Sequence, residues 1–117
     1  MGQLRNRSNG SVLAGRVRFA RGWGERYVGL LTRAAVAADE GLWFERAHAV
    51  HTLGMRVAVD LIFVDAEGRV LRTDAGVRPG RLSVACAGAK GVVEMGSGFL
   101  AAARVDVGDV LVLEDGS

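Results

Sequence analysis

Asp60 is the residue whose type and position most strongly suggest chemistry. It is the one charged residue in the apolar run over residues 57–64, which predicts a strand with nonpolar side chains on both faces. A carboxylate in such a strand must be paired or hydrogen-bonded, or it is driven toward its neutral form. Two roles fit: a general base in a cleft, or an acceptor for turn amides or an arginine that holds the corner at Gly54. We favour the structural role.

Glu45, His48 and His51 are spaced at intervals of three. On a helix this spacing would make one metal-binding face, but the segment predicts a strand, where it places the two histidines on opposite faces. A zinc site also needs three or four convergent ligands, and only residues distant in sequence could complete one. The sequence therefore predicts no metal and no cofactor, and His51 is better interpreted as a pocket residue.

Signatures of nucleophilic catalysis and phosphate binding are missing from the chain. Cys86 is the single cysteine, has no CxxC partner and is flanked by alanines, which is typical of a small core residue. No GxSxG, P-loop or dinucleotide-binding motif is present. The remaining catalytic candidates are Asp60 or Glu94 as a base, with His51 assisting.

Positive charge is concentrated at the start of the chain. Residues 1–33 hold seven arginines and one acid, whereas residues 34–117 hold eight cations and twelve acids. A basic segment of this kind can contact phosphate, so weak nucleic-acid or phosphate binding is one hypothesis. The arginines lack the interleaved aromatic residues typical of single-strand binders, which favours solvated charged faces.

Length and composition predict one soluble domain. The chain has 117 residues, half of them hydrophobic, which is enough for a core without disulfides. No apolar run approaches the roughly 20 residues that a membrane helix needs, and no signal peptide is recognisable. We therefore expect a cytoplasmic protein that is a monomer or weak dimer.

Short apolar segments separated by turn residues predict a mostly β (α+β) fold. Residues 1–10 are polar and are expected to form a flexible lead before a single β-rich domain over residues 11–117. Strands are predicted over residues 11–19, 41–44, 50–53, 57–64, 69–73, 82–85, 91–95 and 110–113, and short helices over residues 25–33 and 99–104. A type I turn at residues 65–68, with Gly68 in the left-handed position, predicts an antiparallel hairpin. This spacing favours an antiparallel barrel or sandwich of about seven strands with one or two short helices.

Several short motifs follow one another in a fixed order between residues 12 and 114. They are Gly29-Leu30-Leu31-x-Arg33, Gly41-Leu42-Trp43-Phe44, His51-Thr52-x-Gly54-Met55-Arg56, Val59-Asp60-x-x-Phe63-x-Asp65-x-x-Gly68-x-Val70, then Ala89, Val92-Val93-Glu94-Met95, Gly98 and Gly108-Asp109. This ordered set resembles the domain of unknown function 192 family, also called uncharacterised protein family 0127. The resemblance implies a small β-rich domain with no established reaction, cofactor or catalytic set. Some bacterial relatives are encoded near pilus or secretion genes, which implies an accessory role there.

Two features depart from the family pattern. Members commonly have a proline two residues before the strand aspartate, where this chain has Ala58, so the corner is expected to be looser. Many relatives carry a secretory or lipoprotein leader, which is not expected here because no such pattern is recognisable in the N-terminal residues.

Our first hypothesis is a non-catalytic binding or accessory module for a small polar ligand or a protein segment. Its predicted ligand-binding residues are His51, Met55, Arg56, Asp60 and Trp43. A strand edge could also recruit a peptide by adding a strand. The alternative is a small hydrolase-like enzyme that uses the acid and histidine candidates named above.

Overall fold

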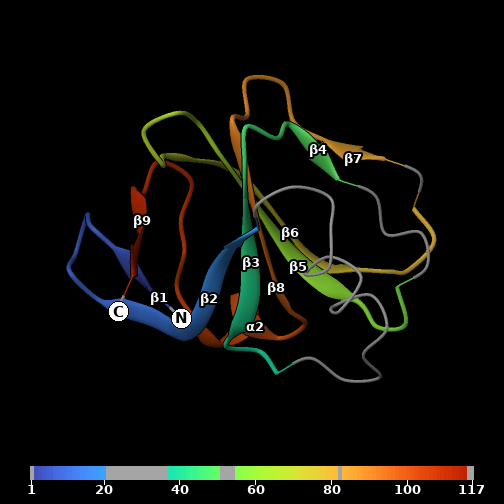
Figure 1. Cartoon of the computed structure of the whole chain (residues 1–117), viewed down its shortest axis with the longest axis horizontal. Coiled ribbons are helices and arrows are strands. Elements are labelled where there is room, and N and C mark those ends of the chain that lie inside the picture. The colour runs from blue at the N-terminus through green and yellow to red at the C-terminus, as the bar shows by residue number, and fades with distance from the viewer. Residues whose placement is uncertain (1, 21–36, 51–54, 82, 116–117) are drawn as a thin grey trace.

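The part of the protein that the structure describes is built from short strands and one short helix. The computed structural model describes residues 2–20, 37–50, 55–81 and 83–115. The strands in these residues are β1 (Gly2–Asn6), β2 (Val12–Ala20), β3 (Glu40–Glu45), β4 (Ala49–Val50), β5 (Val59–Val64), β6 (Val70–Val77), β7 (Val84–Ala85), β8 (Gly91–Gly96) and β9 (Leu111–Asp115). The helix α2 spans Phe99–Ala102 (Figure 1).

Seven of these strands form one curled sheet in the order β6-β5-β8-β3-β2-β1-β9, and β4 pairs with β7 separately. Neighbouring strands are antiparallel except β2 and β3, which run parallel. The two ends of the sheet meet at one corner, where Arg69 and Val110 form an antiparallel bridge. The predicted mostly β single domain is therefore confirmed, and its sheet is curled without being closed into a barrel.

Apolar clusters cover both faces of the sheet. The face that packs against α2, here the α2 face, carries Trp43, Ile62 and Val93, which cluster with Phe99 of α2. The other, here the Leu61 face, carries Leu61, Phe63 and Val92. Every residue of β5 and of β8 is buried, so the prediction of a strand covered on both sides is confirmed for β5.

Strand β1 differs from the prediction of a flexible lead over residues 1–10. It pairs with β2 on one side and β9 on the other, and Leu4 is fully buried. The buried Asn6 donates from Nδ2 to Asp109 Oδ2 over 2.9 Å and accepts from the Ser8 amide through Oδ1. A polar segment thus becomes a strand because its neighbours supply the pairing, which local composition does not reveal.

The hairpin between β5 and β6 agrees with the predicted turn. Asp65 Oδ1 accepts the amides of Glu67 and Arg69 at 2.9 Å each, which is an Asx-type turn. Gly68 has a φ of 85°, and its carbonyl accepts the Leu111 amide over 2.8 Å. The turn therefore also joins the two ends of the sheet.

Gly68→Ala is expected to destabilise the fold by at least about 2 kcal/mol, because a side chain is strained at this φ and its Cβ would collide with the Leu111 carbonyl oxygen. Gly10→Ala is a matched control, since Gly10 has a φ of 78° and open space around its Cα. The free energy of unfolding of that variant should fall by about 1 kcal/mol, from backbone strain alone. Chemical denaturation measures both losses, and equal losses would contradict the close contact with β9.

One of the two predicted helices lies in the described part of the chain. The turn predicted over residues 99–104 is confirmed as α2. The helix predicted over residues 25–33, and the end of the strand predicted over residues 50–53, lie outside the described residues. Within the described part of the chain, no helix has the length and apolar character needed to cross a membrane.

Candidate functional site

Asp60 lies in β5 and is almost completely buried, with 1% of its surface exposed. Its Oδ1 accepts the amide of Gly76 in β6, and its Oδ2 accepts the amide of Leu100 in α2, each over 2.8 Å. Gly98, at the start of α2, supplies no side-chain cap, so Asp60 satisfies one of the helix amides that would otherwise lack a partner. Both carboxylate oxygens are thus committed to backbone amides, as the structural role predicts.

Glu94, in β8, has the opposite surroundings. The side chain is fully buried, and neither carboxylate oxygen has a hydrogen-bond partner among the described residues. It lies between Leu42 of β3 and Leu61 of β5 in the sheet register. Burial without compensation disfavours the charged form and raises the pKa of Glu94 to about 7.

The sheet separates these two acids. In the register of β5 with β8, Asp60 lies opposite Met95 and Glu94 lies opposite Leu61, so the two acids occupy neighbouring cross-strand pairs. Successive side chains of a strand point to opposite faces, which places Asp60 on the α2 face and Glu94 on the Leu61 face. The structure therefore does not bring together the two carboxylates of the enzyme hypothesis, and His51 lies outside the described residues.

The residues predicted to bind a ligand are also divided. Trp43 belongs to the cluster on the α2 face, whereas Met55 packs in the cluster on the Leu61 face. Arg56 is exposed. Of the predicted set, Asp60 and Trp43 share a face of the sheet.

The other candidates give no catalytic or metal centre in the described part of the chain. His48 and Cys86 are joined through their backbones, since the Cys86 amide donates to the His48 carbonyl. No group of three or more His, Cys, Asp or Glu side chains that could hold a metal ion occurs among the described residues.

Arg16, one of the cations of the basic N-terminal segment, is paired with Asp39 at 2.8 Å. Their hydrogen bond and charge attraction raise the pKa of Arg16 and lower that of Asp39.

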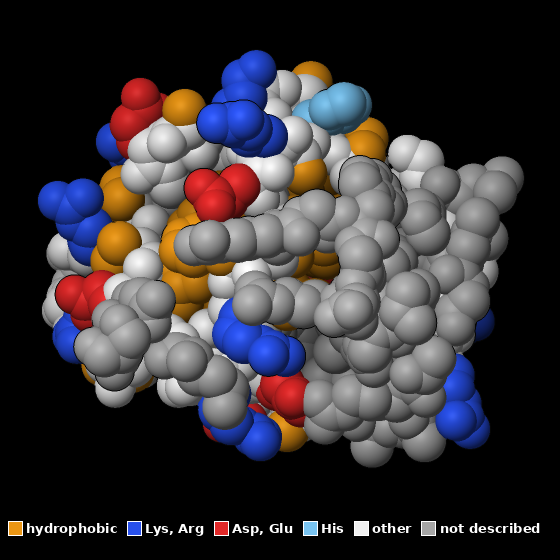
Figure 2. All heavy atoms as spheres, in the orientation of Figure 1, with side chains coloured by type: hydrophobic (Ala, Val, Ile, Leu, Met, Phe, Trp, Pro, Cys, Tyr) orange, Lys and Arg blue, Asp and Glu red, His pale blue; other side chains and the backbone are white. Residues whose placement is uncertain are grey.

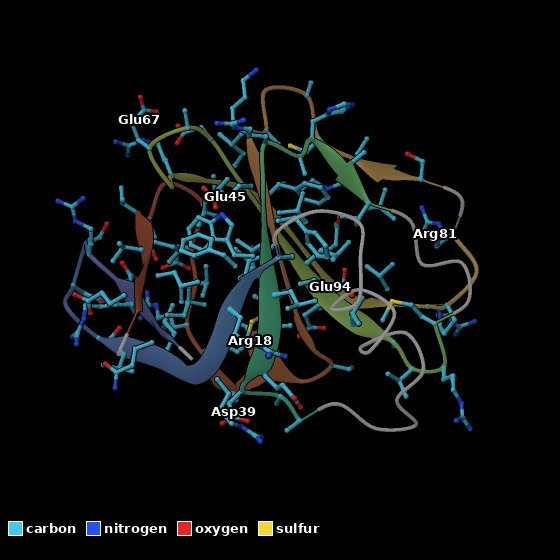
Figure 3. The ribbon with its side chains drawn as sticks, in the orientation of Figure 1. Arg18, Asp39, Glu45, Glu67, Arg81 and Glu94 are labelled. Atoms are coloured by element: carbon cyan, nitrogen blue, oxygen red, sulfur yellow. The ribbon has the colours of Figure 1, made fainter. Side chains whose placement is uncertain are left out.

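A pocket opens at the mouth of the curled sheet, with a volume of about 360 Å³. We call it the mouth pocket. Its lining comes from β2, β3, β8, β9 and the turn after β5: Phe19, Trp43, Glu45, Arg46, Asp65, Ala66, Glu67, Gly68, Lys90, Gly91, Leu111, Val112 and Leu113. Figure 2 shows hydrophobic side chains exposed in a hollow there, with charged side chains above them, and Figure 3 labels Glu45 in the upper part of this region.

The floor of the mouth pocket is aromatic. The rings of Phe19 and Trp43 lie with centroids 5.9 Å apart and planes inclined by 52°. The indole nitrogen of Trp43 is close to Gly91, where a Cβ would lie 3.0 Å from it, so the residue at position 91 must be small. Glycine at this position thus leaves room for the indole to form part of the pocket wall.

Charges of both signs surround the aromatic floor. Glu45, Asp65 and Glu67 are the acids, and Arg46 and Lys90 the cations. Arg46 has a φ of 59°, a conformation that is uncommon for a residue other than glycine and that often marks a functional position. A hydrophobic floor with a few polar groups at its rim is the usual composition of a small-molecule site.

Sequence reasoning identified Trp43 but missed the rest of the mouth pocket. Its walls come from segments separated by up to about ninety residues, and they meet only because the two ends of the sheet converge. No local motif marks that convergence. The one sequence signal near this site is Gly68, because its left-handed turn lies where the two ends of the sheet meet.

Comparison with known proteins gives a family and a fold. The family model DUF192, described as "Uncharacterized ACR", matches residues 4–113. A crystal structure of a protein of unknown function from Novosphingobium aromaticivorans is similar over 95% of this chain and 82% of its own, with a TM-score of 0.76 and 25% identity.

A second solved structure shares the fold. It is a Sinorhizobium meliloti protein that its description proposes as a transcription regulator, similar over 96% of this chain and 91% of its own, with a TM-score of 0.77 and 21% identity. No curated protein matches the chain.

Proposed function

Since the chain belongs to the domain of unknown function 192 family, which implies no established reaction, we propose that it is a binding module that holds a small amphipathic ligand in the mouth pocket. The observation that carries this proposal is the aromatic pair Phe19–Trp43 at the floor of a 360 Å³ pocket. That volume lies within the roughly 300–1,000 Å³ typical of ligand sites.

The lining favours a particular class of ligand. An apolar or aromatic group fits against Trp43, because a ring packs on the indole in a tilted or offset arrangement. Polar substituents then reach the rim, where Glu45 offers a carboxylate and Lys90 an ammonium group. A ligand that carries groups of both charges around one apolar moiety would satisfy the pocket best.

The two buried acids support binding over catalysis. A general base must be able to reach the proton that it removes, and the Asp60 oxygens are both engaged by backbone amides. Glu94 lies on the Leu61 face, on the other side of the sheet from the mouth pocket. The described lining of the mouth pocket therefore offers binding groups and includes neither of these buried acids.

A thermal-shift screen of amphipathic metabolites tests the proposal. A ligand at 100 times its dissociation constant should stabilise the folded state by about 2.7 kcal/mol, which raises the melting temperature by several degrees. A tenfold loss of affinity at the same concentration would halve that stabilisation. We expect such a loss when a compound that stabilises the parent is tested on Trp43→Phe, Glu45→Gln or Lys90→Gln. The shift of each variant is measured from its own ligand-free melting temperature.

Glu114→Gln is the control, because Glu114 is an exposed acid of β9 that does not line the mouth pocket. Its ligand-induced shift should equal that of the parent. Stabilisation that is unchanged in all three pocket variants, or a screen without any stabilising compound, would contradict the proposal.

A further inference from the structure

Strand β6 forms one end of the seven-stranded sheet. Among the described strands β6 pairs with β5. On its other side Val70 exchanges backbone hydrogen bonds with Gly108 and Asp109, and the rest of β6 pairs with no other described strand. A strand in this position presents backbone donors and acceptors that can pair with another chain. Ala75 and Gly76 of β6 are exposed, and a Cβ on Gly76 would meet none of the described residues within 4 Å, so none of these residues covers the face of the strand there.

The edge of β6 is shaped by a bulge. Val59 and Leu61 of β5 are paired with Val77 and Asp74, so β6 carries one extra residue over this interval. Gly76, in the bulge, has a φ of 63°, and its amide donates to Asp60. Because bulges bend and twist a strand, this edge is locally bent rather than straight.

A cleft of about 440 Å³ lies along this edge, lined by Arg72, Thr73, Asp74, Ala75, Gly76, Val77, Arg78, Arg81 and Val84. We call it the arginine cleft. It gathers three of the eight cations of residues 34–117, a part of the chain in which acids are in excess. Figure 3 shows Arg81 at the right of the view and Glu67 at the upper left, and the two linings share no described residue, so this cleft is distinct from the mouth pocket.

The positive charge of the cleft is partly preorganised. The Arg72 guanidinium donates to the Ala85 carbonyl over 3.1 Å and lies 5.7 Å from the centroid of the Phe63 ring. It also forms an ion pair at 2.9 Å with Asp74, the one acid among the described lining residues. Arg78 and Arg81, both exposed, add two further guanidinium groups at the end of the strand.

We propose that the arginine cleft is a docking site for an extended acidic segment of a partner protein, which adds a strand to β6 and places its carboxylates against Arg78 and Arg81. Strand addition supplies affinity through backbone hydrogen bonds, and alternate side chains of the added strand supply specificity. Guanidinium groups suit carboxylates because they form short, charge-assisted and often bidentate hydrogen bonds. The proposal is independent of ligand binding in the mouth pocket.

A fluorescent peptide of alternating threonine and aspartate residues is the probe, titrated onto the full chain and followed by fluorescence anisotropy. We expect saturable binding that weakens as salt is raised, because the contacts with carboxylates are exposed to solvent. The double variant Arg78→Gln/Arg81→Gln should bind at least about tenfold more weakly, since it loses two charge-assisted contacts. The double variant Arg7→Gln/Arg104→Gln removes the same net charge elsewhere and should bind like the parent.

Two further probes separate strand addition from simple charge attraction on the unaltered protein. A peptide with asparagine in place of aspartate keeps the backbone but loses the charge, and a peptide with every backbone nitrogen methylated keeps the charge but cannot donate hydrogen bonds. Both should bind at least about tenfold more weakly than the probe. Absence of saturable binding, equal binding by the two double variants, or full affinity of the methylated peptide would each overturn the proposal.

Discussion

Glu94→Gln is expected to become progressively more stabilising relative to the parent as pH rises from 5 to 8. Burial raises the pKa of Glu94 to about 7 in the folded state, against the 4.5 that is usual for an exposed glutamate. The folded protein then binds the proton more tightly than the unfolded chain, so the parent loses stability as pH rises through this interval. Glutamine does not ionise in this pH range, so the variant lacks this pH-dependent loss of stability.

The size of the effect follows from the two pKa values. Between pH 5 and pH 8 the free energy of unfolding of the parent should fall by about 2–3 kcal/mol relative to that of Glu94→Gln, and it should change little further above that range. Well below pH 4.5 the carboxyl is protonated in both the folded and the unfolded state, so the difference in stability between parent and variant no longer changes with pH. The constant cost of burying an unpartnered amide affects the variant at every pH and does not alter the slope.

Urea denaturation of both proteins at several pH values measures this change. Glu67→Gln is a suitable control because Glu67 is exposed at the rim of the mouth pocket. Parallel stability profiles for the parent and Glu94→Gln would show that Glu94 titrates normally in the folded state. That outcome would contradict its burial between Leu42 and Leu61 without a hydrogen-bond partner among the described residues.

Asp60→Ala is expected to lower the free energy of unfolding by at least about 3 kcal/mol. It removes two hydrogen bonds from a buried carboxylate, each worth about 1.5–3 kcal/mol, and leaves the amides of Gly76 and Leu100 without that acceptor. Asp60→Asn keeps one acceptor oxygen and should lose about half as much. Hydrogen exchange should accelerate at the Gly76 and Leu100 amides in both variants.

Asp106→Ala is the matched control for this series. Asp106 is exposed and pairs with Arg104 at 3.3 Å, so its loss should cost less than about 0.5 kcal/mol. Unchanged melting of Asp60→Ala, or slow exchange of the Leu100 amide in that variant, would show that Asp60 does not connect β5 with α2.

Local sequence signals predicted the centre of the fold well. The apolar run over residues 57–64 and the turn that ends at Gly68 identified β5, β6 and their antiparallel pairing, because a doubly covered strand and a left-handed turn leave clear marks in sequence. The same signals could not predict β1. Its Leu4 and Asn6 are buried only because β2 and β9, nearly the whole chain apart, come to lie on either side of it.

The two acids show how far a site can be predicted from one chain. The prediction that Asp60 accepts structural hydrogen bonds is confirmed, but its partners are Gly76 and Leu100, which follow from a bulge and a helix start that no motif marks. The predicted role at the corner stays untested, because Gly54 lies outside the described residues. Glu94 and Asp60 could be combined in one hypothetical active site only while the register was unknown. Once β5 and β8 are paired, the two-residue period of a strand assigns the acids to opposite faces.

The most direct test of ligand binding in the mouth pocket is to map a bound compound by nuclear magnetic resonance. A compound from the thermal-shift screen is titrated into ¹⁵N-labelled protein, and the amide and indole signals are followed. We predict that the Trp43 indole and the amides of Gly68 and Leu111 shift together with one dissociation constant. Shifts confined to the Leu61 face, for example at Leu61 and Val92, would contradict binding in the mouth pocket.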